Sequence, residues 1–413
     1  NGTMVEFANS GGTLTVSGVL DRNGDSAAII RATSNNNTSA INVSGSGLFN
    51  VRGQTTIGTA YGSSTNNTLN INLSNSGTFN ATSWVNVSPV KGQIVNLNLS
   101  GTSVFKATEI SLNEGGNTVS DGKACVNVSV ADNALFQSTG ILHIGRTSEN
   151  VETNLVQTGG TVKAQRIRLN DVANKQQNVG IYQLNGGVML ISSDGNSRAD
   201  NNRNIGDSAI TVGADSFVYL NGGTIAVNGN NNASNGTASG TGRMIIQDGG
   251  VTIDTQVTGD DYGFAANLAL EHGGVNAKDG GLVKTGVGTL LLNAANTYTG
   301  DTIVNAGTLI LGDAEALGAG GDLRLFNGVT VSLSYSGVAD LDALWFNDVI
   351  VSSLNIGQSY TAAELNNALS TTIFTGVGSL SITQIPEPST LTLLLIGAGL
   401  LTVSAARRRK CER

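Results

Sequence analysis

One phrase recurs along the first half of the chain and constrains the fold more than any other feature. It alternates apolar and polar residues, ends in Ser or Val, passes through a short turn and reaches a Phe. Four copies lead to Phe49, Phe79, Phe105 and Phe136. Because alternation with a period of two is typical of a half-buried strand, each copy predicts β-structure.

The same position continues beyond the four Phe residues with aliphatic side chains. Val162, Met189 and Ile225 follow paired glycines, so the successive spacings from Phe49 are 30, 26, 31, 26, 27 and 36 residues. Three strands of about 5 residues, joined by turns of about 2–4 residues, need about 20–27 residues per coil. This agreement favours an all-β fold, a parallel β-helix solenoid that we expect to be right-handed.

Equivalent residues of successive coils lie above one another in such a solenoid. We therefore expect the four Phe side chains to stack inside as one aromatic ladder. Asn42, Asn72 and Asn98 should face outward, because they occupy the polar positions of the alternation. The spacing assigns residues 1–279 to coils of this kind.

The composition excludes several other classes of protein. The chain has 413 residues with 55 Gly, 39% hydrophobic residues and only 13% charged residues. Coiled coils and helical bundles need more Ala, Glu, Lys and Leu, and nucleic-acid binders need a basic face. Disordered chains are more charged and richer in Pro than this one, which has 3 Pro. No nucleic-acid partner is therefore expected.

A second Gly-rich unit covers residues 280–320. It reads GGLVKTGVGTLLLN from Gly280, followed by NTYTGDTIVNAGTL from Asn296. This unit closely resembles the autotransporter-associated β-strand repeat of bacterial autotransporter passengers. The side chains that we expect to face the core are Leu282, Leu290, Leu292, Val304 and Leu309.

Lys284 is the odd residue of this unit, because it lies among apolar neighbours. It could contact a ligand. The preferred interpretation is a solvated lysine at a strand edge, where a charge prevents pairing with another strand.

Residues 321–385 should close the coil. Short strands are expected at 329–335 and 348–354, and a last strand at 374–380. Thr361 and Glu364 are three residues apart, as in a capping box, so they predict the start of a small helix. Such a helix would cover the open end of the solenoid.

The final 28 residues, 386–413, have three parts: Pro386-Glu387-Pro388, an apolar run over 391–406, and a basic tip. The run has 16 residues, which make a helix of about 24 Å against a hydrocarbon core of about 30 Å. Basic flanks stay cytoplasmic, so we expect a single transmembrane helix with the body outside. Its apolar residues include Leu391, Leu393, Leu394, Leu395, Ile396, Leu400, Leu401 and Val403, and the tip that sets the topology contains Arg407, Arg408, Arg409 and Lys410.

The charge distribution agrees with two compartments. Residues 407–413 hold five of the 22 basic and one of the 30 acidic residues, so this tip carries +4 and the preceding body carries −12. The chain starts at Asn1 with no apolar segment near Met4, and we expect a separate export signal upstream of it.

This layout resembles the PEP-CTERM sorting signal of Gram-negative bacteria. The resemblance implies that Pro386, Glu387 and Pro388 are recognised by an exosortase, a membrane protease, while the helix acts as a temporary tether. It implies passage through the inner membrane and a final place on the outer surface or in the extracellular matrix. The two prolines suit an extended, accessible segment, because they continue neither helix nor sheet.

Candidate catalytic residues form no recognisable constellation. The carboxylate pairs that could perform acid and base chemistry on a glycosidic bond are Asp260 with Asp261, Asp313 with Glu315, and Asp340 with Asp342. The two histidines, His143 and His272, have no neighbours at metal-ligand spacing. We expect no enzyme activity, no cofactor and no metal.

The function that the sequence favours is that of a non-catalytic exported structural protein, active in adhesion or in association with extracellular polysaccharide. One alternative is a carbohydrate-active β-helix enzyme, a polysaccharide lyase or hydrolase. The other is a true autotransporter passenger. This last alternative is disfavoured, because an outer-membrane barrel needs many strands of about 10 residues and 104 residues follow Leu309.

Overall fold

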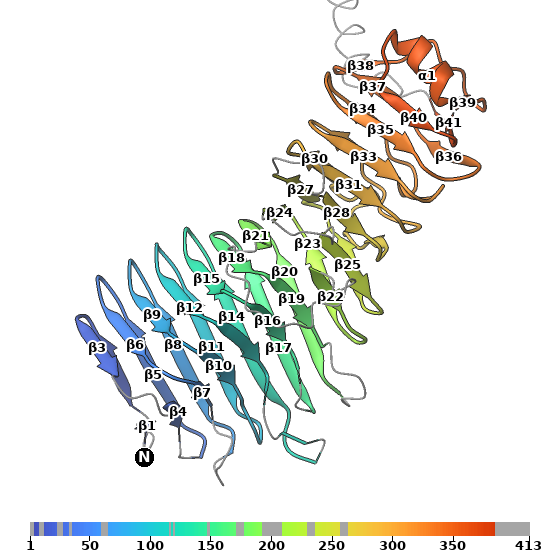
Figure 1. Cartoon of the computed structure of the whole chain (residues 1–413). Helices are drawn as coiled ribbons and strands as arrows, with labels where there is room; N and C mark the ends of the chain where they lie inside the picture. The colour runs from blue at the N-terminus through green and yellow to red at the C-terminus, as the bar shows by residue number, and fades with distance from the viewer. Residues whose placement is uncertain are drawn as a thin grey trace, which may run out of the picture.

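The protein is a parallel β-solenoid. The computed structural model describes residues 4–7, 12–22, 28–32, 35–58, 65–114, 117–118, 120–146, 149–170, 177–191, 209–228, 236–256 and 263–384. Through residue 285 each coil adds one strand to each of three long sheets, which we call A, B and C. Figure 1 shows the coils stacked from the blue N-terminal end to the orange cap that holds helix α1. The fold class that the sequence predicts is confirmed, and its expected right-handed winding stays a prediction.

Through residue 285 the strands follow one another in strict rotation through the sheets A, B and C. Sheet A contains β1 (Met4–Phe7), β4 (Ala28–Ala32), β7 (Thr55–Ile57), β10 (Trp84–Val87), β13 (Glu109–Leu112), β16 (Ile141–Ile144), β19 (Arg166–Leu169), β22 (Ile210–Val212), β25 (Gly236–Gly240), β28 (Gly263–Ala266), β31 (Thr289–Leu292), β33 (Thr308–Leu311), β35 (Thr330–Leu333) and β40 (Phe374–Gly376). Sheet B contains β2 (Thr13–Val16), β5 (Thr38–Val43), β8 (Thr68–Leu73), β11 (Ile94–Leu99), β14 (Ala124–Val130), β17 (Val151–Gln157), β20 (Val179–Leu184), β23 (Phe217–Leu220), β26 (Arg243–Ile246) and β29 (Leu270–His272). Sheet C contains β3 (Val19–Arg22), β6 (Leu48–Val51), β9 (Thr78–Ala81), β12 (Val104–Ala107), β15 (Leu135–Ser138), β18 (Thr161–Ala164), β21 (Val188–Ile191), β24 (Thr224–Val227), β27 (Val251–Thr255), β30 (Leu282–Thr285), β32 (Thr302–Val304), β34 (Leu323–Leu325), β37 (Leu344–Phe346) and β38 (Val349–Ile350).

The aromatic ladder lies inside sheet C as the repeats predict. Phe49 pairs in register with Phe79, Phe79 with Phe105, and Phe105 with Phe136. The ring centroids are 5.1, 4.6 and 5.3 Å apart, and the middle pair is stacked with an interplanar angle of 2°. All four side chains are buried. Because rings at these distances attract one another beyond their apolar burial, the ladder fixes the register of the first coils.

The interior column continues from the ladder into the rest of the solenoid. Val162, Met189 and Ile225 follow Phe136 in register, as their position after paired glycines predicts. Ile253 extends the column, and all four side chains are buried. One continuous narrow core therefore replaces the globular core of an ordinary domain.

Lys284 occupies the next place in this interior column, and the expectation of a solvated edge lysine is wrong. It pairs in register with Ile253 on one side and Val304 on the other, and its side chain is fully buried. Its Nζ donates hydrogen bonds to the carbonyl oxygens of Thr285 (2.7 Å), Gly286 (2.8 Å) and Ala306 (3.0 Å). The ammonium thus satisfies carbonyls of two neighbouring coils, while burial lowers its pKa to about 8.

The coils become two-stranded after β29, which ends sheet B. Leu290 pairs with Leu309, 19 residues further on, so a third strand no longer fits within each coil. Asn296 helps to replace it: its Oδ1 accepts from the Leu270 N–H (2.8 Å) and its Nδ2 donates to the Ala316 carbonyl (2.5 Å). Tyr298 is buried beside it and its hydroxyl lies 2.6 Å from Thr302 Oγ1. The core-facing leucines and Val304 of this unit are buried as expected.

A small cap ends the stack at its C-terminal side. Strands β36 (Val338–Leu341), β41 (Ser379–Ile382) and β39 (Ser359–Thr361) form a separate sheet, and α1 spans Ala362–Leu369. The predicted capping box is confirmed, since Thr361 and Glu364 bond reciprocally at the start of α1. The Asn366 amide both donates to the Phe374 carbonyl and accepts from its N–H, each at 2.8 Å, and so ties the helix to β40.

Within the ranges given above, no helix is long and apolar enough to cross a membrane. The predicted transmembrane helix, residues 391–406, lies outside the part of the chain that the structure describes.

Replacing Phe105 with Ala tests the interior ladder. Its ring is fully buried and lies between Phe79 and Phe136, so Phe105→Ala should lower the free energy of unfolding by about 3–5 kcal/mol. Urea denaturation followed by circular dichroism measures this loss. The adjacent, exposed Lys106 supplies the control, and Lys106→Ala should change stability by less than about 0.5 kcal/mol. Equal effects of the two substitutions would contradict the inward position of Phe105.

Replacing Lys284 with Met tests the buried ammonium through pH. Between about 8, the pKa in the fold, and 10.5, the ordinary value, the unfolded chain holds a proton that the folded chain has lost. Wild-type stability should therefore rise with pH across this window relative to Lys284→Met, because unfolding takes up the proton. The difference in urea midpoints, measured at several pH values, reports this rise. The same comparison of the wild type with Lys106→Met should show no such rise. A difference between the wild type and Lys284→Met that stays constant with pH would show that Lys284 keeps its ordinary pKa.

Candidate functional site

Rows of amide side chains run along the outside of the solenoid. Asn42, Asn72 and Asn98 face outward from sheet B, as predicted, and none of them is buried. Asn72 Nδ2 donates to Asn42 Oδ1 (2.8 Å), and Asn98 Nδ2 donates to Asn72 Oδ1 (2.9 Å). The column therefore links three coils by side-chain hydrogen bonds in addition to the backbone ladder.

A second amide row, not singled out from the sequence, lies two residues away on the same face. It joins Asn70, Asn96, Asn127 and Asn154 through bonds of 2.8, 2.9 and 3.2 Å between successive coils. The signal was present in the sequence, because two strands contain Asn-x-Asn and residues two apart in a strand share a face.

An aromatic pair continues this face toward the C-terminal end. Phe217 and Tyr219 on β23 point outward, while Val218 and Leu220 between and after them are buried. Their ring centroids lie 6.0 Å apart with an interplanar angle of 16°. Alternation alone could have placed both rings outside, yet this segment lacks the repeated phrase that marks the earlier coils.

The two predicted carboxylate pairs that the structure describes are not arranged as acid–base sites. Asp313 Oδ1 accepts the Glu315 N–H (2.8 Å), which is the bond of a tight turn. Asp340 is exposed on β36, whereas Asp342 is buried just after it. Asp260 and Asp261 lie outside the described residues.

His272 and Asp279 form a contact that the sequence spacing did not suggest. His272 Nδ1 lies 2.9 Å from Asp279 Oδ2, and Thr299 Oγ1 lies 3.1 Å from the same ring nitrogen. A nucleophilic triad requires the hydroxyl at the opposite ring nitrogen from the carboxylate. Here the Asp279 carboxylate and the Thr299 hydroxyl both lie at Nδ1, so the three side chains do not have the geometry of a triad. Their contacts instead position the segment between β29 and β30.

Asp279 is held as an anion by the backbone of two coils. Its oxygens accept the N–H groups of Gly281 (2.9 Å), Thr299 (2.8 Å) and Gly300 (2.9 Å). Burial raises the pKa of Asp279, but these bonds and the one from His272 lower it more, so it lies below its ordinary value. Gly300 has no room for a side chain, because a Cβ would lie 2.3 Å from the Gly281 nitrogen. Two coils are therefore pressed together at this carboxylate.

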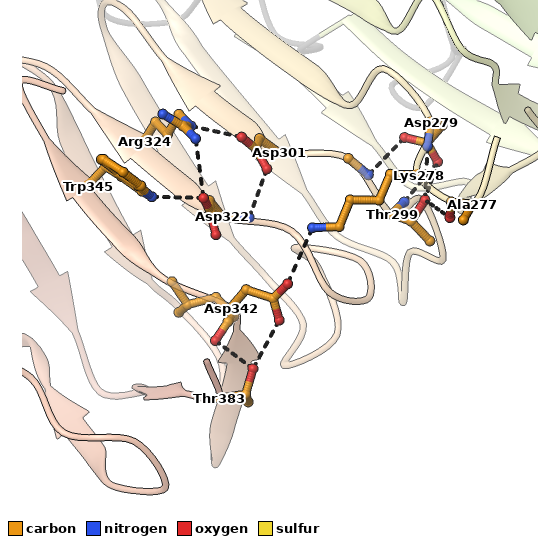
Figure 2. A network of polar contacts seen from close by, with 12 residues as sticks. Ala277, Lys278, Asp279, Thr299, Asp301, Asp322, Arg324, Asp342, Trp345 and Thr383 are labelled. Atoms are coloured by element: carbon orange, nitrogen blue, oxygen red, sulfur yellow. Dashed lines mark hydrogen bonds and ion pairs between the residues drawn. The ribbon is translucent and has the colours of Figure 1, made fainter. Parts of the chain in front are cut away.

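Further acidic residues line the same corner of the next coils, as Figure 2 shows. Asp301 Oδ1 accepts the Asp322 N–H (3.1 Å), and Asp301 Oδ2 accepts from Arg324 Nε (2.8 Å). Lys278 Nζ lies 3.3 Å from Asp342 Oδ2. The corner is thus a chain of bonds from one coil to the next.

Trp345 and Arg324 complete this network on the outside of sheet C. Trp345 Nε1 donates to Asp322 Oδ2 (2.8 Å), and the Arg324 guanidinium lies 4.5 Å from the centre of the Trp345 ring. Burial and the neighbouring Asp301 charge raise the pKa of Asp322, against the influence of Trp345 and Arg324. The network stabilises the C-terminal coils by charge-assisted bonds and a cation–π contact.

His143 belongs to another network, on the outside of sheet A. Leu142 and Ile144 are the inward residues of β16, so His143 between them lies on the outer face, yet its side chain is buried. Its Nε2 lies 3.4 Å from Glu109 Oε1. Arg146 Nη1 contacts both Glu114 oxygens at 3.1 Å. Among the residues that the structure describes, no three His, Cys, Asp or Glu side chains gather as metal ligands.

The predicted sorting residues, Pro386 to Pro388, the apolar run and the basic tip, lie outside the described part of the chain. Their roles stay predictions. The last described residues, Thr383 and Gln384, still bond to the preceding coil through the Leu341 and Asp342 carbonyls.

Comparison with known proteins supports both resemblances. Residues 282–311 match the family model of the passenger-associated transport repeat, and residues 384–410 match that of the PEP-CTERM protein-sorting motif. A 171-residue stretch is 35% identical to the adhesin BmaC autotransporter of Brucella suis biovar 1 (strain 1330). This stretch is 41% of the present chain but only 4% of that relative's length. No solved structure matches the chain.

The two matches cover different parts of the molecule. The first begins at β30 and ends with β33, where the coils have become two-stranded and Lys284 is buried. The second starts two residues after β41, the last strand of the cap. The protein is therefore a β-solenoid that carries a passenger-associated transport repeat in its C-terminal coils and a PEP-CTERM protein-sorting motif after its cap.

Proposed function

We propose that this protein is an exported, non-catalytic solenoid of a Gram-negative bacterium that acts in adhesion at the cell surface or in the extracellular matrix. One observation carries the proposal: the solenoid is closed at Ile382, and the sorting-motif match starts at residue 384. The body and the sorting segment therefore adjoin, with no further described domain between them.

The C-terminal segment would work as a temporary tether. The apolar run over 391–406 places the chain in the inner membrane, and the basic residues from Arg407 to Lys410 stay on the cytoplasmic side. The recognition residues then lie just outside the bilayer, where an exosortase-type protease reaches Pro386, Glu387 and Pro388. Cleavage there frees the body for the outer surface or the matrix.

The body suits adhesion better than catalysis. Its stretch of similarity to an adhesin supports this role, and the elongated stack in Figure 1 exposes a large surface for its mass. The carboxylates of the C-terminal corner, Asp279, Asp301 and Asp322, already bond to backbone groups or cations. Extracellular polysaccharide is the partner that the amide-rich surface favours, because amides bond to hydroxyl groups without needing charge.

Replacing Pro386, Glu387 and Pro388 together with Ala tests sorting in the native host. The wild-type chain should lose its tail and leave the inner membrane, which shows as a lower mass in the cell-surface or medium fraction. The triple variant should keep the full mass in the inner-membrane fraction, because the protease no longer recognises it. Fractionation with intact-mass analysis measures both outcomes.

Asp340→Ala is the matched control, because it changes an exposed acidic residue of the body without touching the tail. It should be sorted like the wild type. A wild-type chain that stays soluble in the cytoplasm with its tail intact contradicts the proposal, as does normal processing of the triple variant.

A further inference from the structure

The outer face of sheet B carries regular columns of residues, two of which contain the amide ladders. We define this face by the outward residues of β5 to β26. The first column contains Asn70, Asn96, Asn127, Asn154, Ile181, Phe217 and Arg243. The second contains Asn42, Asn72, Asn98, Ser129, Val156, Gln183 and Tyr219, and it ends at Ile245, which is buried. The amides of the first column end at Asn154 and those of the second at Asn98, apart from Gln183, and both columns carry an aromatic residue on β23.

The amide half of the face offers a lattice of hydrogen-bonding groups. Each Asn within a ladder uses one N–H of its Nδ2 and one lone pair of its Oδ1 along the column, as in the 2.9 Å bond from Asn127 to Asn96. The second N–H and lone pair of Asn72, Asn96 and Asn127 stay available to a partner, whereas Asn154 donates its second N–H to Glu152 Oε1 (2.9 Å). Neighbouring coils place these groups about 4.8 Å apart, and the two columns are about 6.6 Å apart along the strands.

The aromatic half offers flat apolar surface. Phe217 and Tyr219 are partly exposed and nearly parallel, at 16°, so their rings lie side by side above one strand. Ile181 and Gln183 of the preceding coil lie beside them in register. Aromatic rings with one exposed face and a polar tip are suited to partners that are apolar on one side and hydrogen-bonding on the other.

The face carries almost no free charge. Among its described residues, Glu152 and Arg243 are the charged ones. Glu152 pairs with Lys123 at 2.5 Å, and Arg243 pairs with Glu271 at 2.6 Å. The outer face of sheet C, by contrast, holds Lys106, Lys163, Asp254 and Arg324. A partner that covers sheet B therefore needs no charge of either sign.

We infer that the outer face of sheet B binds an extended chain of uncharged sugars. The hydroxyl groups of such a chain bond to the outward amides, and the C–H faces of its rings pack on Phe217 and Tyr219. A polyanion would find no unpaired cationic side chain on this face. A lattice of amides that repeats from coil to coil suits a repeating chain better than the irregular surface of a protein partner. The inference rests on the proposed function and adds the class of ligand and the surface that receives it.

Affinity electrophoresis of the full chain in mild detergent tests this assignment. The gel contains hydroxyethylcellulose as the uncharged glycan or alginate as the anionic one. Hydroxyethylcellulose should retard the wild type, with little change when salt is raised, and alginate should not. Phe217→Ala/Tyr219→Ala and Asn127→Ala should each weaken retardation about tenfold, which is the scale for one lost stacking or hydrogen-bonding contact in a repeated site.

Two control variants separate the face from the fold. Asn80→Ala breaks the same kind of amide bond on sheet C, the 2.7 Å bond to Asn50, and Trp84→Ala removes an outward aromatic side chain from sheet A. Both should bind like the wild type, with circular dichroism spectra equal to those of the sheet B variants.

Loss of binding in either control variant, unchanged binding in the sheet B variants, retardation by alginate in place of hydroxyethylcellulose, or no retardation by either glycan would each overturn the assignment. The proposed function is judged separately, by fractionation and mass in the host. If the chain is sorted to the surface but is not retarded by hydroxyethylcellulose, the proposed function stands and the ligand assignment is rejected. If the chain stays in the cytoplasm but binds hydroxyethylcellulose, the ligand assignment stands and the proposed function is rejected.

Discussion

Parallel pairing in register between successive coils is the constraint on which the whole molecule depends. Each strand presents backbone groups to the coil before and the coil after, so one register determines the position of every side chain. The interior Phe column and the exterior Asn columns are consequences of the same alignment, seen from the two sides of the sheets. A substitution that shifts one coil by a residue would move its Phe outside and its Asn inside.

Much of this alignment could be predicted, because the repeated phrase puts like residues at like positions. Phe49 to Phe136, the outward Asn column and the capping box at Thr361 all follow from alternation, spacing or local chemistry. Alternation alone places Lys284 inside, two residues after Leu282. The expectation of a solvated lysine is wrong because three carbonyl oxygens accept the N–H groups of its ammonium inside the coil.

Other features could not be predicted from the sequence. The third wall of the C-terminal coils depends on Asn296, whose side-chain amide bonds through its oxygen to Leu270 and through its nitrogen to Ala316, in different coils. Nothing in its local pattern marks it, because the bonds are tertiary. The corner network joins Asp301, Asp322 and Asp342, which are 21 and 20 residues apart. Their proximity can be predicted only when the length of the shortened coils is known. The repeats of the first half of the chain suggest longer coils.

The cap has a consequence for how copies of this protein behave when crowded together. A parallel stack with a bare last strand is a template on which another chain can add, in the way that fibrils elongate. Here β38 runs antiparallel to β37, β39 runs antiparallel to β41, and the Asn366 amide occupies both backbone groups of Phe374. These antiparallel strands and the Asn366 bonds make the cap a poor template for a further parallel coil, and this disfavours end-to-end growth of the stack at this end.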